Sequence, residues 1–364
     1  MTSLVKKGLY RSAEWSRQSR TLMAWPDAAT LEAVSDLLPG VTKDICNIAE
    51  SISRFQPVTV IVGKQRVHEA TEWSSRLKQK HAVTIHPFES DEMDLWMRDF
   101  APTFVTRTEN EKKRLCGVDF RFNGWGNKYP TSASVVTAST LLKDLAIEAI
   151  DSAIVSEGGA IEIDGEGTLM ATESSIINDN RNPGMGKEEI EAELKRLLGL
   201  DRVLWIPGRK GYDVTDCHID TLARFIQPGK VLLSRPTPSS ESVFHEIYKE
   251  AKEILSRETD ARGRSLDIVE VEEANIHAIG LSNQSLQALN EPGSIPALNY
   301  ANYLMVNGGV ILPQYGDKTT DANARETFGK IFPNLEIAPV HISTICYLGG
   351  VIHCSTQEVP DLEA

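Results

Sequence analysis

The sequence predicts an α/β fold in a single domain spanning residues 1–364. Apolar runs of strand type and amphipathic runs of helix type alternate along the whole chain. Strand-type runs often come in pairs ahead of a helix, and no Pro- or Ser-rich linker divides the chain. This arrangement favours one domain of repeated ββαβ-like units over two joined domains, although the units share little sequence similarity.

Strand-type runs recur through most of the chain. Most have branched or aromatic residues at alternate positions and end at Gly, Pro, Asn or Asp, as strands do. Within one of these runs, "DGEGTL" from Asp164 predicts a hairpin turn. The runs begin at Val58, Ala82, Leu115, Gly159, Arg202, Lys230, Leu266, Tyr303 and Leu335.

Helix-type runs fall between the strands. The clearest is "KEEIEAELKRLLGL" at residues 187–200, where isoleucine and leucine side chains share one face and glutamates fill the first turn. Gly199 marks its C-terminal end. Similar spacing predicts helices over residues 41–55, 134–150 and 241–257.

Composition limits the classes of partner. The chain has 364 residues, a formal net charge of -13 and a sequence pI of about 5.2. This acidic balance argues against a nucleic acid or an anionic membrane surface and is compatible with a cationic substrate. No run reaches the roughly 18 apolar residues of a membrane span, and "MTSLVKKGLYRSAEW" lacks the apolar core of a secretory signal.

The cysteines bear on location and metal binding. Cys46, Cys116, Cys217, Cys346 and Cys354 are widely spaced and form no CxxC pair. Their odd number suits reduced thiols rather than a disulfide framework, so we expect a cytoplasmic protein. No set of ligands has a recognisable zinc spacing, so we expect no metal.

Two stretches place charged residues at the start of strand-type runs. "DLWMRDFAPTFV" contains Trp96 and Asp99, and "SEGGAIEI" puts Glu157 ahead of two glycines. The first has a structural interpretation as a salt-bridged loop, and the second as a solvated strand edge with a glycine bulge. Neither stretch predicts a function by itself.

"YDVTDCHIDTLARF" carries a denser group of charges. If it is a strand, Asp216, His218 and Asp220 alternate and point to one face. A lone histidine is more often a core residue, but three ionisable groups on one strand face are costly to bury without a purpose. The residues alone support a structural and a functional interpretation equally.

Two further stretches combine glycines with an apolar run. "NGGVILPQYGD" begins at Asn307, and "LGGVIHCSTQEVP" places Cys354 after a Gly-Gly pair and beside His353. Buried structural cysteines are common, whereas a thiol in a glycine-flanked turn can also be a nucleophile. In a strand, the side chains of His353 and Cys354 would point to opposite faces, which disfavours proton transfer between them.

In their order along the chain, these stretches resemble the agmatine deiminases and bacterial-type peptidylarginine deiminases of the guanidine-modifying superfamily. The resemblance runs from about Trp15 to Gln357 and implies the pentein fold, a five-bladed pseudo-symmetric α/β propeller around a central site. It implies no cofactor, a small cationic guanidino substrate and, because related enzymes are commonly dimers or larger, a homodimer. The matching segments are "WMRD", "FNGWGNKY", "EGG", "NDNRNPGMGKEEIEAEL", "CHID", "NGGV" and "GGVIHCSTQ".

The resemblance also assigns catalytic roles at matching positions. Cys354 is the nucleophile, His218 the general acid and base, and Glu157 the carboxylate partner of that histidine. Asp99 and Asp220 resemble the carboxylates that hold the guanidinium. The implied reaction converts a guanidinium to a ureido group through a covalent thiouronium intermediate and releases ammonia. With agmatine, the product is N-carbamoylputrescine.

This chemistry requires such groups. A guanidinium carbon is a poor electrophile because its charge is delocalised, and two carboxylates would fix it for attack. A thiol with a reference pKa of about 8.5 needs a positive neighbour to ionise at neutral pH. The amine that leaves must be protonated, which suits a histidine.

Other positions bear on substrate choice. Trp96, Asn307 and Asp216 are expected to line the substrate site. Around the histidine, Val214, Asp216 and Cys217 replace the Glu, Asn and Gly that agmatine deiminases usually carry. These departures affect the assignment of agmatine more than the assignment of guanidine hydrolysis.

Two alternatives to an agmatine deiminase stay open. A peptidylarginine deiminase would convert arginine residues to citrulline and needs a more open site, but the sequence shows no obvious peptide-binding domain. A non-catalytic member of the family would bind a guanidinium ligand or a protein partner without converting it. The intact set of nucleophile, histidine and carboxylates argues against this second alternative.

Overall fold

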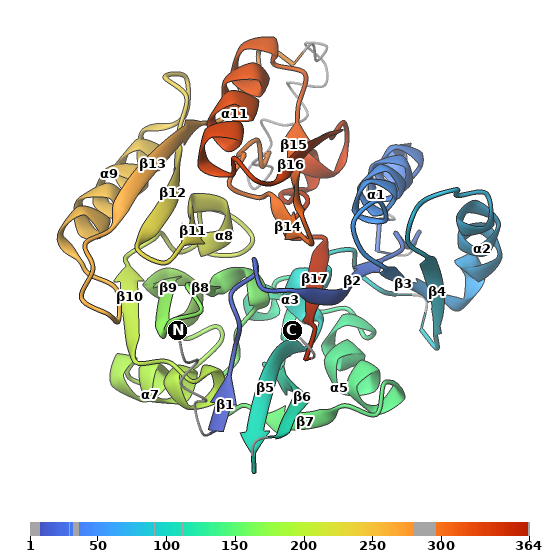
Figure 1. Cartoon of the computed structure of the whole chain (residues 1–364), viewed down its shortest axis with the longest axis horizontal. Helices are drawn as coiled ribbons and strands as arrows, with labels where there is room; N and C mark the ends of the chain where they lie inside the picture. Colours follow the sequence, from blue (N-terminus) through green and yellow to red (C-terminus); the bar gives the residue numbers. More distant parts are fainter. Residues whose placement is uncertain are drawn as a thin grey trace.

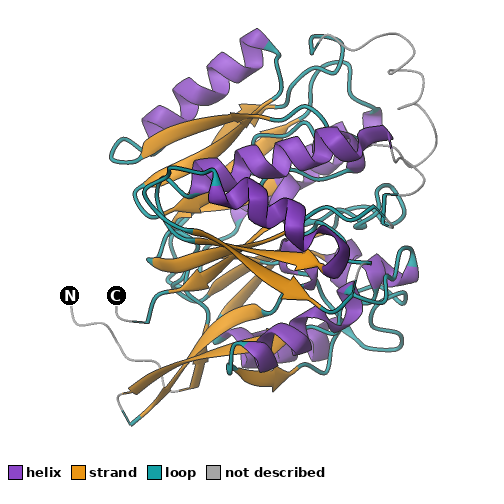
Figure 2. Ribbon diagram, turned by 90° about the vertical axis from the view of Figure 1, so that its right-hand side faces the viewer, coloured by secondary structure: helices purple, strands orange, loops and turns teal. Residues whose placement is uncertain are grey.

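Five small mixed sheets stand around a common centre, with the longer helices outside them (Figure 1). The computed structural model describes residues 8–362 apart from 29, 32–35, 91, 111 and 280–295. The side view shows the helices packed against the sheets (Figure 2). The predicted five-bladed α/β propeller is confirmed. The N-terminal segment that we expect not to be a secretory signal includes residues 1–7, which lie outside the described residues.

Each sheet contains the same unit. Two strands pair antiparallel, a helix follows, and the next strand pairs parallel with the second one. This is the ββαβ order predicted from the alternation of strand-type and helix-type runs. The connecting helices in the described ranges are α1 (Leu38–Ile52), α5 (Ser134–Asp144), α7 (Lys187–Leu198), α9 (Ser242–Arg257) and α11 (Lys318–Ile331).

Two of the sheets have four strands. The first has the order β17-β2-β3-β4, formed by β17 (Thr356–Pro360), β2 (Gln18–Ala24), β3 (Val58–Gly63) and β4 (Val83–Phe88), with α2 (Val67–Ser75) between the last two. The second has the order β1-β5-β6-β7, formed by β1 (Gly8–Tyr10), β5 (Thr103–Glu109), β6 (Lys112–Asp119) and β7 (Glu148–Asp151).

The other three sheets have three strands. Their strands are β8 (Glu162–Ile163), β9 (Thr168–Thr172) and β10 (Arg202–Ile206); β11 (Ala223–Gln227), β12 (Lys230–Arg235) and β13 (Asp267–Glu272); and β14 (Leu304–Val306), β15 (Gly309–Gln314) and β16 (Glu336–His341). Short helices complete the described elements: η2 (Lys64–Arg66), α3 (Met97–Phe100), α4 (Gly124–Asn127), η3 (Gly158–Ala160), α6 (Glu173–Ile176), α8 (Ile219–Leu222) and η4 (Ile345–Leu348).

The ring is closed by strands from opposite ends of the described chain. β17 pairs antiparallel with β2, so that Gln357 lies opposite Leu22. β2 then pairs parallel with β3, which completes the same unit as in the other sheets. One blade is therefore assembled from segments that lie more than 300 residues apart.

Local sequence signals account for the helix ends. Helix α7 buries the predicted apolar face and ends at Gly199, whose φ of 68° lies in the left-handed region. The predicted helix over residues 134–150 is wrong in its second half. Helix α5 stops at Asp144, Ala146 takes a left-handed turn with a φ of 53°, and Glu148–Asp151 forms strand β7. No helix of the described chain is long and apolar enough to cross a membrane.

Candidate active site

The site residues lie where the blades begin, around the centre of the ring. Asp99 is in α3, just before β5, and Glu157 precedes η3 and β8. His218 and Asp220 flank the start of α8, just before β11. Cys354 is in the turn that leads into β17. Segments far apart in the sequence thus meet at the centre, where α3, α8 and β17 lie in Figure 1.

Cys354 is held by its backbone and by an amide side chain. Its carbonyl accepts a hydrogen bond from the backbone N–H of Arg98 at 3.0 Å. Its own N–H donates to Asn302 Oδ1 at 3.2 Å, and Asn302 Nδ2 lies 3.1 Å from Sγ. Burial and the charges of Asp220 and Asp99 raise the pKa of the Cys354 thiol well above its ordinary value. The thiol therefore needs a cation in the site before it ionises.

Two buried carboxylates face this thiol. Asp99 accepts hydrogen bonds from Trp125 Nε1 at 2.8 Å and from the N–H of Gly159 at 3.0 Å. Asp220 Oδ2 lies 3.7 Å from Cys354 Sγ. Within the described ranges, the buried Oδ1 of Asp220 has no hydrogen-bond partner. A buried carboxylate oxygen without a donor is costly, so this atom is suited to accept from a cationic ligand.

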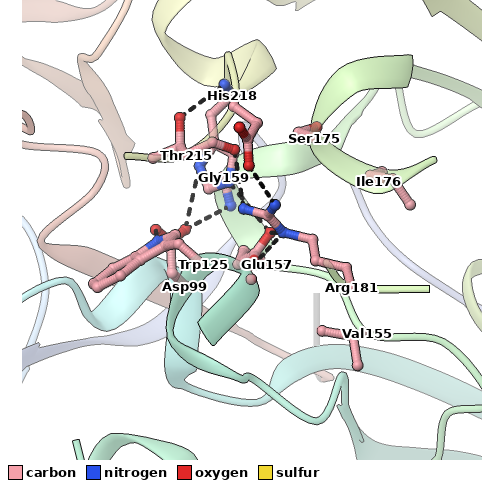
Figure 3. A network of polar contacts seen from close by, with 12 residues as sticks. Asp99, Trp125, Val155, Glu157, Gly159, Ser175, Ile176, Arg181, Thr215 and His218 are labelled. Atoms are coloured by element: carbon pink, nitrogen blue, oxygen red, sulfur yellow. Dashed lines mark hydrogen bonds and ion pairs between the residues drawn. The ribbon is translucent and has the colours of Figure 1, made fainter. Parts of the chain in front are cut away.

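His218 lies among carboxylates (Figure 3). Its Nε2 is 3.3 Å from Glu157 Oε2, and its Nδ1 is 3.7 Å from Asp99 Oδ1. Burial alone would lower the pKa of His218, but Asp99, Glu157 and Asp220 outweigh it and raise the pKa to about 9. The imidazole is therefore protonated at neutral pH and can act as an acid.

A chain of buried ion pairs supports the histidine from behind. Arg181 Nε donates to both oxygens of Glu157, at 2.8 and 3.0 Å, and Arg181 Nη1 donates to Asp216 at 2.7 Å. Asp216 also accepts from Lys128 Nζ at 2.8 Å. The Asp216 carboxylate, expected to bind substrate, is thus occupied by protein cations. The geometry favours a role in positioning Arg181 over direct substrate contact.

Glycines give the site its close packing. The ring of Trp96 lies against the backbone of Gly350, where a Cβ atom would overlap it. At Gly159, a Cβ atom would lie 2.6 Å from His218 Nδ1, 2.8 Å from Asp99 Oδ1 and 3.2 Å from Asp220 Oδ2. The first contact places Trp96 beside the turn that carries Cys354, and the second shows how tightly the polar groups converge.

No metal centre is found in the parts of the chain that the structure describes. No three His, Cys, Asp or Glu side chains there are grouped so that they could hold a metal ion. All five cysteines lie within the described ranges and are free thiols.

The family model for Porphyromonas-type peptidyl-arginine deiminases matches residues 10–360 of the chain. This chain belongs to that family. Among its relatives, the agmatine deiminase of Medicago truncatula is 34% identical over 373 residues, which cover 97% of this chain and 96% of the relative.

Solved structures of agmatine deiminases share the fold. The agmatine deiminase of Enterococcus faecalis, captured catalysing its reaction, is 28% identical, with a TM-score of 0.82 and full coverage of both chains. The agmatine deiminase of C. jejuni with substrate bound is 25% identical, with a TM-score of 0.80 and 99% of each chain covered. The resemblance inferred from the motifs is therefore confirmed over almost the whole of this chain.

The contacts of Asn307 are structural, and its role in lining the site stays a prediction. Asn307 and Gly308 form the two-residue turn between β14 and β15, and Gly308 has a φ of 84°. The side chain of Asn307 bonds the backbone of Gln18, at 3.0 Å to its N–H and 2.7 Å to its carbonyl. Asn-Gly is a strong hairpin signal, and it accounts for this segment without a site role.

Asn302 is the site residue that sequence reasoning missed. It contacts Cys354, and its Nδ2 lies 3.3 Å from Asp220 Oδ2. It lies in the turn before β14, the position in its blade that corresponds to the other site residues. The feature that could have identified Asn302 is its position just ahead of the first strand of a blade. This position can be recognised only when the blades are aligned with one another.

Two assumptions about strands are also wrong. Residues 212–218 form turns rather than a strand, and Asp216 and Cys217 have φ values of 61° and 73°. His218 and Asp220 reach the site from the start of α8 instead of alternating along one strand face. His353 and Cys354 likewise lie in a turn rather than a strand.

Proposed function

We propose that this protein is an agmatine deiminase, which hydrolyses agmatine to N-carbamoylputrescine and ammonia. The observation that carries the proposal is the buried pair Asp99 and Asp220, which faces the Cys354 thiol and leaves one carboxylate oxygen without a donor among the described residues. Such a site suits a planar cation beside a nucleophile. The full-length similarity to agmatine deiminases identifies the cation.

Binding of the guanidinium prepares the nucleophile. Burial, Asp220 and Asp99 raise the pKa of the Cys354 thiol in the free protein, and a bound cation compensates the charge of the two carboxylates. The thiol proton then leaves to solvent, and Sγ attacks the guanidinium carbon. The two carboxylates hold the carbon in position for this attack.

His218 then acts as acid and as base. It donates its proton to one nitrogen of the tetrahedral adduct, the C–N bond breaks, ammonia leaves, and the thiouronium intermediate forms. The neutral imidazole accepts a proton from water as the oxygen adds to the same carbon. The adduct formed by the addition of water then collapses, the C–S bond breaks, and the ureido product leaves. In the net reaction, the ammonia and one proton leave as ammonium.

The supporting residues receive roles from their contacts. Glu157, fixed by Arg181, keeps His218 protonated and oriented. Asn302 donates to Cys354 Sγ and stabilises its negative charge. Trp96 packs beside the nucleophile turn and forms one wall of the site.

Further assignments concern the domain, the cellular location, the class of substrate and the assembly. We propose one catalytic domain because β17 closes the ring with β2. A cytoplasmic location is supported by the free thiols, and a small guanidino substrate by the buried site. A homodimer and the absence of a cofactor follow from the family resemblance, and light scattering of the purified protein measures the first.

The decisive experiment is an assay of ureido product from agmatine, free arginine and a blocked arginine peptide. We expect product from agmatine, and Cys354→Ala should reduce it to background while Cys346→Ala retains it. Cys346 is a matched control because its thiol is equally buried but lies in η4, outside the site. Product from the peptide alone would assign the protein as a peptidylarginine deiminase, and no product from any of the three would overturn the proposal.

A further inference from the structure

His353, the neighbour of the nucleophile, lies between two buried carboxylates. Its Nδ1 is 2.7 Å from Asp220 Oδ2, and its Nε2 is 2.8 Å from Glu14 Oε2. The ring is almost fully buried. The mechanism above does not use this residue, yet it contacts one of the two carboxylates assigned to the substrate.

Both carboxylates accept hydrogen bonds from this ring. Burial raises the pKa of Glu14, but Arg224, His353 and Arg98 outweigh it and lower the pKa below its ordinary value. The pKa of Asp220 is also lowered, because His353, His218 and Arg224 outweigh its burial. Ionised carboxylates only accept hydrogen bonds, so the geometry calls for a donor at each ring nitrogen of His353.

Glu14 is itself fixed, so that it holds the ring from behind. Its Oε2 accepts from Arg224 Nη2 at 2.8 Å, and its Oε1 accepts from the backbone N–H of Met305 at 2.7 Å. Arg98 Nε lies 3.3 Å from the carbonyl of His353 and fixes the backbone of the same turn. The charged groups that face this cluster from the surrounding elements are Arg11, Arg98, Glu162, His218, Arg224 and Glu358.

We propose that His353 is a positioning residue for substrate binding: held by Glu14, its imidazolium fixes Asp220 so that the other carboxylate oxygen is presented to the guanidinium. This inference rests on the proposed function of the site. It accounts for the arrangement in which Oδ2 of Asp220 is bonded to protein donors while Oδ1 has none among the described residues. His353 also keeps Asp220 ionised beside Asp99, which would otherwise favour a shared proton.

The test measures agmatine binding in a protein that cannot turn it over. Calorimetry on Cys354→Ala gives Kd from pH 5 to pH 9, and His353→Gln is then added to this background. Glutamine keeps one donor but carries no charge. We expect Kd at pH 7 to rise about 10-fold or more, and the acid limb of binding to move upward by at least one pH unit, because Asp220 then protonates more easily.

Asp44→Asn is the control for lost stability alone. Asp44 is buried and accepts from the N–H groups of Ser343, Thr344 and Ile345, away from the site. We expect it to lower Tm without moving the acid limb. Glu14→Gln should also weaken agmatine binding. The double variant Glu14→Gln with His353→Gln should lose less binding free energy than the sum of the losses in the two single variants.

The experiments distinguish a failure of the proposed function from a failure of the role of His353. If Cys354→Ala binds no agmatine, the proposed function fails, and a carbon-13 titration of the aspartate carboxyls tests His353 by itself. Asp220 should then titrate at higher pH in His353→Gln. A folded His353→Gln with unchanged Kd and acid limb, or an unchanged Asp220 titration, would overturn the role of His353.

Discussion

Gly159 is the residue at which three polar side chains of the site converge. Its N–H donates to Asp99, and a methyl group on its Cα would lie within 3.2 Å of atoms in His218, Asp99 and Asp220. An alanine side chain at this position would therefore force the neighbouring side chains to move. The residue therefore sets the separation between the acid and the two carboxylates.

Gly159→Ala should reduce kcat/KM for agmatine by about 100-fold or more, since displacements near 1 Å carry costs of that size. Steady-state kinetics measure it, with circular dichroism to verify folding. Gly329→Ala is the matched control, because a Cβ at that exposed position of α11 would meet no atom of the described residues within 4 Å beyond its chain neighbours and its own helix backbone. A Gly159→Ala protein with near-normal kcat/KM would contradict the assigned geometry.

The pH dependence of activity should report His218. Its pKa of about 9 keeps the acid form up to that pH, so the alkaline limb of kcat/KM should fall near pH 9. Glu157→Gln removes one of the carboxylates that raise the pKa, so this limb should shift to lower pH. Rates measured from pH 6 to pH 10.5 locate it.

Glu162→Gln provides the comparison for this pH experiment. Glu162 pairs with Arg224 Nε at 2.8 Å, just as Glu157 pairs with Arg181, but it does not touch His218. We expect a loss of stability and an unchanged limb. An alkaline limb that stays in place in Glu157→Gln would show that another group controls it.

At the scale of residues, the motif matches named side chains that the structure brings together, and their catalytic roles stay predictions. Cys354, His218, Asp99, Asp220 and Glu157 do converge, as the resemblance implied. A short pattern can instead have a structural cause.

Asn307 shows such a structural cause. Its Asn-Gly pair builds a hairpin, and that pair is the feature of the sequence that indicates a structural role. Asn302 was missed for the opposite reason, because no glycine or charge stands beside it. Only its contacts with Cys354 and Asp220, which come from other blades, identify it.

At the scale of elements, the turn after α7 shows how a helix is docked. Gly199 has a left-handed φ, and a Cβ there would meet the carbonyl of Leu9 in β1. The N–H of Arg11 also donates to the carbonyl of Leu198 at 3.0 Å. The end of the helix and the edge strand of the neighbouring sheet are therefore packed backbone to backbone.

Gly199→Ala should destabilise the protein more than Gly211→Ala does. Both glycines are left-handed, but no atom lies within 4 Å of a Cβ at Gly211. The backbone conformation alone costs about 1 kcal/mol, so we expect that loss for Gly211→Ala and about 2 kcal/mol or more for Gly199→Ala. Urea unfolding measures both, and equal losses would show that the contact with Leu9 has no effect.

Element types were predictable where the apolar period was strong. The runs at Val58, Arg202 and Lys230 are strands β3, β10 and β12 at their predicted positions. The period failed at residues 145–151, where one left-handed alanine ends the helix pattern. It also failed at residues 212–220, where consecutive left-handed residues bend a sequence that alternates like a strand.

At the scale of the whole molecule, a buried cluster of charges links the blades behind the site. Arg224 bonds Glu162 and Glu14, and Arg98 bonds Glu358, which also pairs with Arg11. These residues come from different blades, and all of them are buried except Glu14, whose side chain is 9% exposed. Each charge depends on partners that only the assembled ring provides.

Arg224→Met should destabilise the fold by about 3–5 kcal/mol, because it leaves Glu14 and Glu162 buried with one cation fewer. Thermal and urea unfolding measure the loss. Arg257→Met is the matched control, since its pair with Glu253 is largely exposed and contributes less than about 1 kcal/mol. Equal effects of the two changes would contradict the importance of the cluster.

The pairing of β17 with β2 fixes the number of repeats. In an open solenoid, each repeat contacts only its neighbours, so repeats can be gained or lost at an end while the others persist. Here the last described strand completes the first sheet, and each blade holds a different chemical group at the centre. Duplication or loss of a blade would break the closure and also misplace or remove a site group. The architecture therefore cannot gain or lose repeats one at a time, as an open solenoid can.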